Sequence, residues 1–278
     1  MTSPVLVTGA TGMLGRAVIA RLVAAGTPVR ALSRGQQQPS AAVSWLTGDV
    51  TTGAGIARAV DGVGAIIHLA SAPYRRGYTR EVEVHGTRRL LEEAAAANVA
   101  HLLYTSIIGC DRIPWGYFRT KTEAERVVAS GPVPASILRL GQFHDFVDQT
   151  FHSLARAGLL VGDRRVLAQP VDTADVAERI HAATRAGPSS RIEEFAGPEV
   201  LDLRLAAEQW STATGTRRYI LPVRVRGKLG KAFRAGHLTT SAAPRGVRTW
   251  RGYLSARYGE PRSSSPATHP HAEGDHLG

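Results

Sequence analysis

The chain has 278 residues, of which 43% are apolar, so it can bury a large core and is not disordered throughout. No stretch reaches the roughly 18 consecutive apolar residues that a membrane-spanning helix needs, the N-terminus shows no secretion signal, and the single cysteine cannot form an internal disulfide, so we expect a cytoplasmic protein. The net charge of +11 comes mainly from one C-terminal stretch and does not by itself indicate a nucleic-acid-binding protein.

Short apolar runs alternate with helical patterns along the first half of the chain. Strands are expected at residues 5–8, 29–32, 43–46, 65–69, 101–106 and 136–140. Residues 13–25 and 87–98, which lie between them, have the apolar spacing of amphipathic helices. This alternation predicts an α/β fold of the Rossmann type, in which helices cover both faces of a doubly wound parallel sheet.

The pattern is less regular in the second half of the chain. Helices are expected near 176–185 and 203–213, and a short strand is expected near 192–196. We expect residues 1–260 to form one domain that carries a small C-terminal substrate lobe, built mainly from 142–170 and 197–260. From residue 261 the composition changes to Ser, Pro, His and Gly without periodicity, which predicts that 261–278 form a disordered tail.

A glycine-rich turn joins the first expected strand to the first expected helix, with the sequence Thr-Gly-Ala-Thr-Gly-Met-Leu-Gly over residues 8–15. The first glycine permits a tight turn, the second lets the backbone approach a pyrophosphate, and the third lets the helix pack close to the strand. The start of a helix also offers free N–H groups and a partial positive charge to an anion. The turn therefore predicts a dinucleotide site. The contacts expected from it are Gly9, Thr11, Gly12, Met13, Leu14 and Gly15.

The second expected strand lacks the acidic residue that, in an NAD site, accepts a hydrogen bond from the ribose 2'-hydroxyl. In its place, Ser33 can donate to a 2'-phosphate, and Arg30 and Arg34 can neutralise that phosphate. The sequence therefore favours NADP (NADPH) over NAD as the cofactor. The remaining expected contacts follow the third and fourth strands, with the first of them near the adenine: Asp49, Val50, Leu69, Ala70 and Ser71.

These features resemble the extended and atypical short-chain dehydrogenase/reductase superfamily, specifically its NmrA-like NAD(P)H-binding branch. The resemblance runs from about Val5 to about Arg257. Its most specific segments are 8–15, 104–106, 111–121, 142–144 and 169–177.

The resemblance implies three catalytic residues, Ser106, Tyr117 and Lys121. Helical spacing of four puts Tyr117 and Lys121 on one face, where the ammonium stabilises the phenolate and makes the phenol a usable proton donor. In the family the lysine also holds the nicotinamide ribose, and the serine orients the substrate carbonyl. The family's asparagine in the preceding helix is not evident, because residues 83–87 read Glu-Val-His-Gly-Thr, and this leaves the proton-relay route in doubt.

The resemblance also implies a substrate-facing loop after the sixth expected strand. It therefore predicts that Gln142, Phe143 and His144 line the substrate pocket. No metal site is expected, since the histidines near the C-terminus have no ligand spacing and no metal motif occurs elsewhere.

The sequence as a whole favours an NADPH-dependent oxidoreductase that transfers a hydride to a small carbonyl or quinone-like acceptor. Two alternatives stay open: an NADP(H)-sensing regulator without turnover, and an isomerase, epimerase or cyclase on the same scaffold. A small-molecule substrate is the expected partner and a homodimer is open, whereas neither a membrane nor nucleic acid is expected. Residues 224–262 carry ten Lys or Arg and one acid. We interpret them as a solvated surface, with an anionic-substrate rim or a polyanion contact as the other interpretations.

Overall fold

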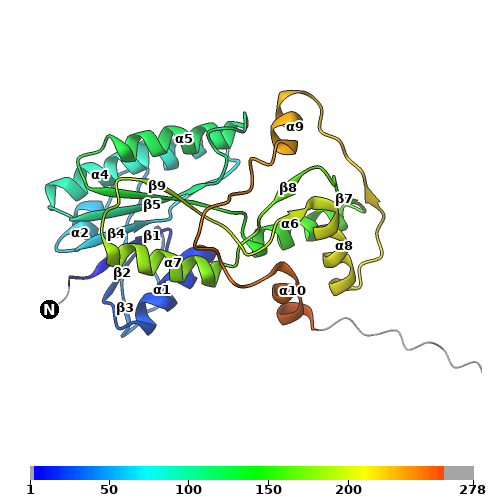
Figure 1. The fold of residues 1–278 in the computed structure, drawn as a ribbon. Helices are drawn as coiled ribbons and strands as arrows, with labels where there is room; N and C mark the ends of the chain where they lie inside the picture. The colour runs from blue at the N-terminus through cyan, green and yellow to red at the C-terminus, as the bar shows by residue number, and fades with distance from the viewer. Residues whose placement is uncertain (1–2, 260–278) are drawn as a thin grey trace, which may run out of the picture.

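The computed structural model describes residues 3–259 and is built around a seven-stranded parallel sheet in the order β3-β2-β1-β4-β5-β6-β9 (Figure 1). The strands are β1 (Val5–Thr8), β2 (Val29–Ser33), β3 (Val43–Thr47), β4 (Ala65–His68), β5 (His101–Ile107), β6 (Ala135–Leu140) and β9 (Ile192–Phe195). All neighbouring pairs are parallel. The strand order reverses between β1 and β4, which confirms the doubly wound, Rossmann-type sheet expected from the sequence.

Helices cover both faces of the sheet because its strands are apolar on both sides. One face carries α2 (Ile56–Val60), α4 (Thr87–Ala96) and α5 (Gly116–Ala129), and the other carries α1 (Met13–Ala24) and α7 (Thr173–Ala186). Within β4, Ile66 belongs to the core on the α4 side and Ile67 to the core on the α1 side. Figure 1 shows α4 and α5 above the sheet and α1 and α7 below it.

The chain between β4 and α4 forms an irregular helical segment. The short helix α3 (Tyr78–Arg80) leads into a π-helix, η1 (Glu81–Gly86), which continues directly into α4. A π-helix is rare, and its wider turn is often found at functional sites. Gly86 lets this segment lie close to the loop after β3, because a Cβ there would come within 2.9 Å of the Val50 side chain. The π-helix carries Glu83, which is fully buried.

A smaller lobe lies beside the sheet and has its own core around Phe151, Trp210 and Trp250 (Figure 1). Its elements are α6 (His144–Arg156), β7 (Leu160–Val161), β8 (Leu167–Ala168), β10 (Leu201–Asp202), α8 (Leu203–Thr214), β11 (Ile220–Leu221) and α10 (Trp250–Tyr258). The helix α9 (Gly227–Arg234) packs instead against the loop after β5 and the start of α5. Residues 171–196 return to the sheet between the two stretches of the lobe, where α7 packs on α1 and β9 pairs with β6.

Two further predictions concern the C-terminal residues and membrane-spanning helices. The expected tail, 261–278, lies outside the described residues. Among residues 3–259, every helix is too short or too polar to cross a membrane.

Candidate functional site

The glycine-rich turn between β1 and α1 packs tightly against the end of β4. Gly9 has a φ angle of +64°, and a Cβ at this position would lie 2.7 Å from the backbone of Leu69 and Ala70. A Cβ on Gly15 would collide with the carbonyl oxygen of Gly9, so this glycine lets α1 begin close to the turn. A Cβ on Gly12 would meet only that same oxygen, at 3.1 Å, and the rest of its surroundings is open.

A cavity of about 330 Å³ lies beside this turn, at the carboxyl ends of β1, β2, β3 and β4. The expected cofactor residues that line it are Gly9, Thr11, Gly12, Ser33, Arg34, Asp49, Val50, Leu69, Ala70 and Ser71. The lining also includes residues that the sequence did not suggest, among them Arg75, Tyr78 and Val82. Met13, Leu14 and Gly15 belong to α1 and lie behind the turn instead of lining the cavity.

Arg30 does not lie at the cavity, in contrast to the prediction. Its guanidinium donates hydrogen bonds to backbone carbonyls near the C-terminal end of α2, at 3.0 Å from the oxygen of Ala59 and 2.5 Å from that of Asp61. The last carbonyls of a helix lack helical partners and carry partial negative charge, so a cation is favoured beside them. Arg30 therefore stabilises the fold, and we no longer expect it to contact a phosphate.

Two arginines line the cavity, Arg34 directly after β2 and Arg75 in the loop after β4. Arg34 donates a hydrogen bond of 2.8 Å to the hydroxyl of Tyr78. Arg75 comes from the loop after β4, which only the tertiary fold brings to the same cavity as Arg34, and for this reason the sequence did not suggest it. Asp49 also lines the cavity, and its Oδ1 accepts hydrogen bonds of 2.8 Å from both the backbone N–H and the hydroxyl of Thr51.

The residues around this cavity fit a dinucleotide. The N-cap of α1 is Gly12, which has no side chain to bond the N–H groups of the first helical turn, so these donors are left for a ligand. The first turn of α1 holds no acidic residue that would repel a pyrophosphate. The cavity extends from this turn to the ends of β2 and β3, where Ser33 and Asp49 can meet a ribose and a base.

Tyr117 and Lys121 lie near the cavity, on α5. The hydroxyl of Tyr117 is 2.9 Å from Oγ of Ser71, which lines the cavity. The Nζ of Lys121 donates a hydrogen bond of 2.7 Å to the backbone carbonyl of Thr105 and lies 4.2 Å from the ring centroid of Tyr104. Helical spacing thus directs both functional groups toward the same edge of the sheet.

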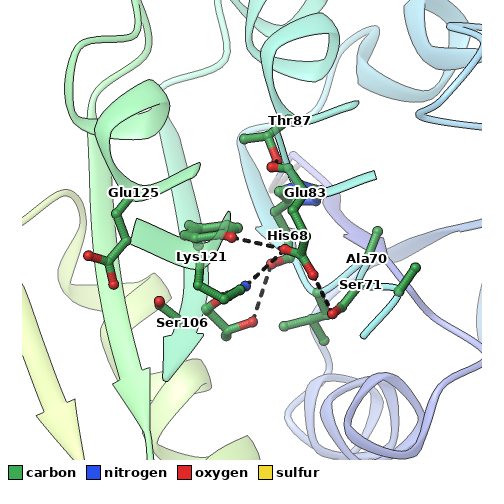
Figure 2. Close-up of polar contacts among 12 residues, drawn as sticks. His68, Ala70, Ser71, Glu83, Thr87, Ser106, Lys121 and Glu125 are labelled. Carbon is green, nitrogen blue, oxygen red and sulfur yellow. Dashed lines mark hydrogen bonds and ion pairs between the residues drawn. The ribbon is translucent and has the colours of Figure 1, made fainter. Parts of the chain in front are cut away.

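Ser106 does not join this pair. It is 3% exposed, and its hydroxyl lies 3.7 Å from the sulfur of Cys110, beneath α5 and near the ion pair of Glu125 and Arg139. Figure 2 shows Ser106 on the Glu125 side of Lys121 and Ser71 on the opposite side. The hydroxyl beside Tyr117 is therefore that of Ser71, and the implied contact between Ser106 and Tyr117 is not formed.

Glu83 lies at the centre of the polar contacts and was not among the expected site residues. Its Oε2 accepts hydrogen bonds from Nζ of Lys121 at 3.0 Å and from the hydroxyl of Tyr104 at 3.1 Å. Its Oε1 accepts a hydrogen bond of 2.5 Å from Ser71 and faces the hydroxyl of Tyr117 at 3.5 Å. Figure 2 shows Lys121 and Ser71 approaching this carboxylate from two sides.

A sequence signal for Glu83 exists, although it is weak. Glu83 shares helical spacing with the buried residues Thr87, Leu90 and Ala94, so an acidic side chain occupies the face that the helix turns to the core. A buried carboxylate is costly unless it is paired, which makes such a residue a candidate for a functional contact.

A second chain of hydrogen bonds holds the π-helix to the sheet. The buried ring of His68 bonds the hydroxyl of Thr8 at 2.7 Å and that of Thr87 at 2.9 Å, and Thr87 donates to the backbone carbonyl of Glu83 at 2.5 Å. Burial lowers the pKa of His68 to about 4, so its ring is neutral at neutral pH. These bonds connect β1, β4 and the start of α4 directly behind Glu83.

Burial and the charges around Tyr117 determine whether its hydroxyl is protonated. Burial by itself raises the pKa of Glu83, but the ammonium of Lys121 and the hydroxyl of Ser71 outweigh burial and hold that pKa below its ordinary value. Burial, followed by the negative charge of Glu83, raises the pKa of Tyr117 well above its ordinary value. Tyr117 is therefore a neutral phenol beside an ionised carboxylate.

The three residues of the expected substrate loop lie apart from these groups. His144 is fully buried at the start of α6, with its ring 5.6 Å from that of Trp250 and 5.3 Å from that of Tyr253. Gln142 and Phe143 are half-buried, and Phe143 packs against the core on the α1 side of the sheet. His144 thus belongs to the lobe interior, and none of the three contacts Tyr117 by a hydrogen bond among the described residues.

Two aromatic side chains that the sequence did not suggest lie next to Tyr117 instead. The ring of Tyr74 is 5.2 Å from that of Tyr117 and 5.4 Å from that of Trp115. Tyr74 and Trp115 are 53% and 38% exposed, so an aromatic surface that continues from the ring of Tyr117 is open to solvent.

Comparison with known proteins gives relatives of similar length. A (4-alkanoyl-5-oxo-2,5-dihydrofuran-3-yl)methyl phosphate reductase of Streptomyces griseus is 31% identical over 220 residues, which cover 76% of this chain and 74% of the relative. Quinone oxidoreductase 2 of Escherichia coli is 25% identical over 215 residues, which cover 73% of this chain and 72% of the relative.

Solved structures show the same fold. The NADPH-dependent quinone oxidoreductase QOR2 of Escherichia coli, complexed with NADPH, superposes with a TM-score of 0.76 at 19% identity and covers 91% of this chain and 99% of its own. A nucleoside-diphosphate-sugar epimerase of Staphylococcus aureus gives a TM-score of 0.75 at 16% identity, covering 90% of this chain and 99% of its own. At these identities the likeness concerns the fold alone.

A family model described as NAD(P)H-binding matches residues 9–186, which contain the glycine turn, the cavity and α5. This match covers well over half of the chain and agrees with the geometry of the cavity. The chain therefore belongs to the NAD(P)H-binding family.

Proposed function

We propose that this protein is an NADPH-dependent reductase that transfers a hydride to a small carbonyl or quinone-like acceptor. The observation that carries this proposal is the position of the Tyr117 hydroxyl, 2.9 Å from Ser71 at the edge of the dinucleotide cavity. A phenol at this place can protonate an oxygen atom of an acceptor that lies beside the cofactor.

Different residues of the cavity would hold different parts of the cofactor. The turn at Gly12 and the free N–H groups of α1 would hold the pyrophosphate, and Ser33, Arg34 and Arg75 would hold a 2'-phosphate. This arginine pair and the absence of an acidic residue at the end of β2 support NADP over NAD. When bound, NADPH supplies the hydride.

Tyr117 holds the proton that completes a reduction. Because burial and Glu83 raise its pKa, the hydroxyl stays protonated at neutral pH and can donate to an oxyanion that develops next to it. The aromatic surface of Tyr74 and Trp115 would pack against a flat, conjugated acceptor. The names of two relatives, an oxo-dihydrofuran reductase and a quinone oxidoreductase, support an acceptor with a carbonyl oxygen.

The test is consumption of NADPH, followed at 340 nm, with a panel of quinones, aldehydes, ketones and enones, together with identification of the product. We expect turnover with at least one acceptor class and a loss of about 100-fold or more in kcat for Tyr117→Phe, with an unchanged cofactor dissociation constant. Tyr219→Phe is the matched control, since this tyrosine is 74% exposed and lies on the lobe. Full turnover by Tyr117→Phe would exclude the proposed proton donor.

A further inference from the structure

The carboxylate of Glu83 joins groups from four different parts of the fold. It lies on the π-helix and contacts Lys121 of α5, Tyr104 of β5, Ser71 of the loop after β4 and, at 3.5 Å, the hydroxyl of Tyr117. Glu83 has no exposed surface, whereas Ser71 is exposed and Tyr117 is half-buried, so the carboxylate is shielded from solvent and its contacts to these two lie at the edge of the cavity. The arrangement is therefore a built contact between a buried anion and the proposed proton donor.

The donor and acceptor roles in this cluster follow from the chemistry of a carboxylate. An ionised carboxylate only accepts hydrogen bonds, so Ser71 must donate its proton to Glu83. The oxygen of Ser71 is then free to accept the proton of Tyr117, at 2.9 Å. The chain of hydrogen bonds thus runs from Tyr117 through Ser71 to Glu83, and it requires Tyr117 to be protonated.

The charges around Tyr117 also favour its protonated form. In a tyrosine–lysine pair the ammonium favours the phenolate, but here the charge of Lys121 is offset by Glu83 at 3.0 Å. Ionising Tyr117 would place a second anion next to the Glu83 carboxylate, which like-charge repulsion disfavours. The other titratable groups around this cluster are Tyr74, Tyr104 and His68, and all three are neutral at neutral pH.

We propose that Glu83 is a positioning residue that holds Tyr117 in its protonated form, which is the form that donates the proton in reduction. This inference rests on the proposed function. In reduction the O–H bond of Tyr117 breaks, an O–H bond forms on the acceptor oxygen, and a phenolate is left. The phenolate then takes a proton from solvent, because the neighbouring Glu83 carboxylate disfavours a second anion. Glu83 stands in the segment where the resemblance leads us to expect an uncharged asparagine.

The first test reads the ionisation of Tyr117 without cofactor or acceptor. Tyrosine labelled with ¹³C at Cζ is incorporated, the Tyr117 signal is assigned with Tyr117→Phe, and the fraction of phenolate is followed by NMR from pH 6 to the highest pH at which the fold is intact. For Glu83→Gln we expect the phenol–phenolate equilibrium to shift toward phenolate by about tenfold or more, which is about one pH unit in the midpoint. Glu125→Gln is the matched control, because Glu125 is also buried and ion-paired on α5 but lacks a contact to Tyr117 among the described residues.

Folding of the variants is checked by circular dichroism. If Glu83→Gln leaves Lys121 unpaired and does not fold, the double variant Glu83→Gln/Lys121→Gln removes both charges and is measured in its place. It should still titrate at lower pH than the wild type, because the anion beside the phenolate is gone. An unchanged Tyr117 midpoint in the folded variant, or an equal shift in Glu125→Gln, would overturn the role of Glu83.

The second test measures kcat against pH in both directions. We expect reduction by the wild type to stay constant into the alkaline range, and Glu83→Gln to lose reduction and gain oxidation at lower pH than the wild type. A shifted Tyr117 midpoint in Glu83→Gln, without turnover on any acceptor, would support the effect of Glu83 on Tyr117 and contradict the proposed reductase activity. Turnover with unshifted NMR and kinetic profiles would retain the reductase and reject the role of Glu83.

Discussion

Arg30 and Arg34 lie only four residues apart, yet they serve different parts of the molecule. Arg30 is inside β2 and donates to the carbonyls that end α2, whereas Arg34 follows the strand and lines the cavity. The carboxyl end of a parallel strand is where ligands bind in such sheets, so a shift of a few residues along β2 separates a structural cation from a binding one.

This separation predicts different effects for the two arginines. Arg34→Ala should weaken NADPH binding about 10- to 100-fold, the usual cost of losing a charge-assisted hydrogen bond, and should change NADH binding little. Arg30→Ala should lower the free energy of unfolding by about 1 kcal/mol without changing the preference between the two cofactors. Isothermal titration with both cofactors checks this, and equal weakening of NADH and NADPH by Arg34→Ala would contradict it.

For single residues, the sequence predicts roles that depend on the neighbouring chain and misses roles that depend on contacts between distant segments. Gly9 and Gly12 could be placed because their roles come from the turn itself. Ser106 could not, because the resemblance gives its position along the chain but not which hydroxyl the packing of α5 brings to Tyr117. Glu83 was missed for the same reason, since its partners come from segments up to 38 residues away.

The π-helix η1 is held in place by a buried histidine. The ring of His68 bonds Thr8 on one side and Thr87 on the other, and so ties η1 and α4 to two strands of the sheet. Both bonds depend on a neutral ring, because protonation would place an unpaired charge in the core.

This histidine predicts an acid-sensitive step in stability. Its pKa is about 4 in the folded state against 6.5 when unfolded, so unfolding takes up a proton as the pH falls below 6.5. The free energy of unfolding should therefore decrease by up to about 3 kcal/mol between pH 6.5 and 4.

Urea unfolding of the wild type and His68→Gln over this pH range measures the effect. The variant should be less stable at pH 7 and lose less stability on acidification than the wild type. His85→Gln, on the same π-helix but outside this chain of hydrogen bonds, is the control and should follow the wild type. Identical pH dependence in the wild type and His68→Gln would show that His68 does not carry the effect.

Among the elements, the seven strands of the main sheet were predicted to within about a residue at either end, because each is a short apolar run between turn signals, whereas β7, β8, β10 and β11 of the lobe were not predicted. The π-helix was not predicted. Its sequence has ordinary helical residues, and the wider turn is fixed by where His68 and Lys121 hold Thr87 and Glu83.

A buried carboxylate on α6 holds three helices of the lobe together. Asp148 accepts hydrogen bonds from the indole of Trp210 on α8 at 2.7 Å, from the hydroxyl of Tyr258 on α10 at 2.7 Å and from Arg257 at 3.1 Å. Three helices from two distant stretches of the chain thus meet at one side chain. Of these three helices only α8 was predicted, near 203–213, and the meeting point could not be predicted because α6 and α10 are about 100 residues apart in the sequence.

Removing this carboxylate should loosen the lobe and spare the cofactor cavity. Asp148→Ala is expected to lower the free energy of unfolding by about 3 kcal/mol, because it leaves buried donors without a partner. The NADPH dissociation constant should change less than about twofold, because the cavity lies in the sheet. Hydrogen exchange should increase in α8 and α10 before it increases in the sheet.

The control for this variant is Glu208→Ala, which removes a half-exposed pair with Arg204 on α8 and should cost less than about 0.5 kcal/mol. Loss of cofactor binding in Asp148→Ala at temperatures where the sheet is folded would show that the lobe and the cavity are one unit.

Ser71 belongs both to the cavity wall and to the hydrogen-bond chain that ends at Glu83. A ligand in the cavity and a proton on Tyr117 therefore share a partner, and their binding equilibria are thermodynamically linked. Linkage is reciprocal, so whatever free energy the bound cofactor adds to the ionisation of Tyr117 must return, in equal amount, as a pH dependence of cofactor affinity. One hydroxyl group thus makes the cofactor's dissociation constant a second, independent report on the proton at Tyr117.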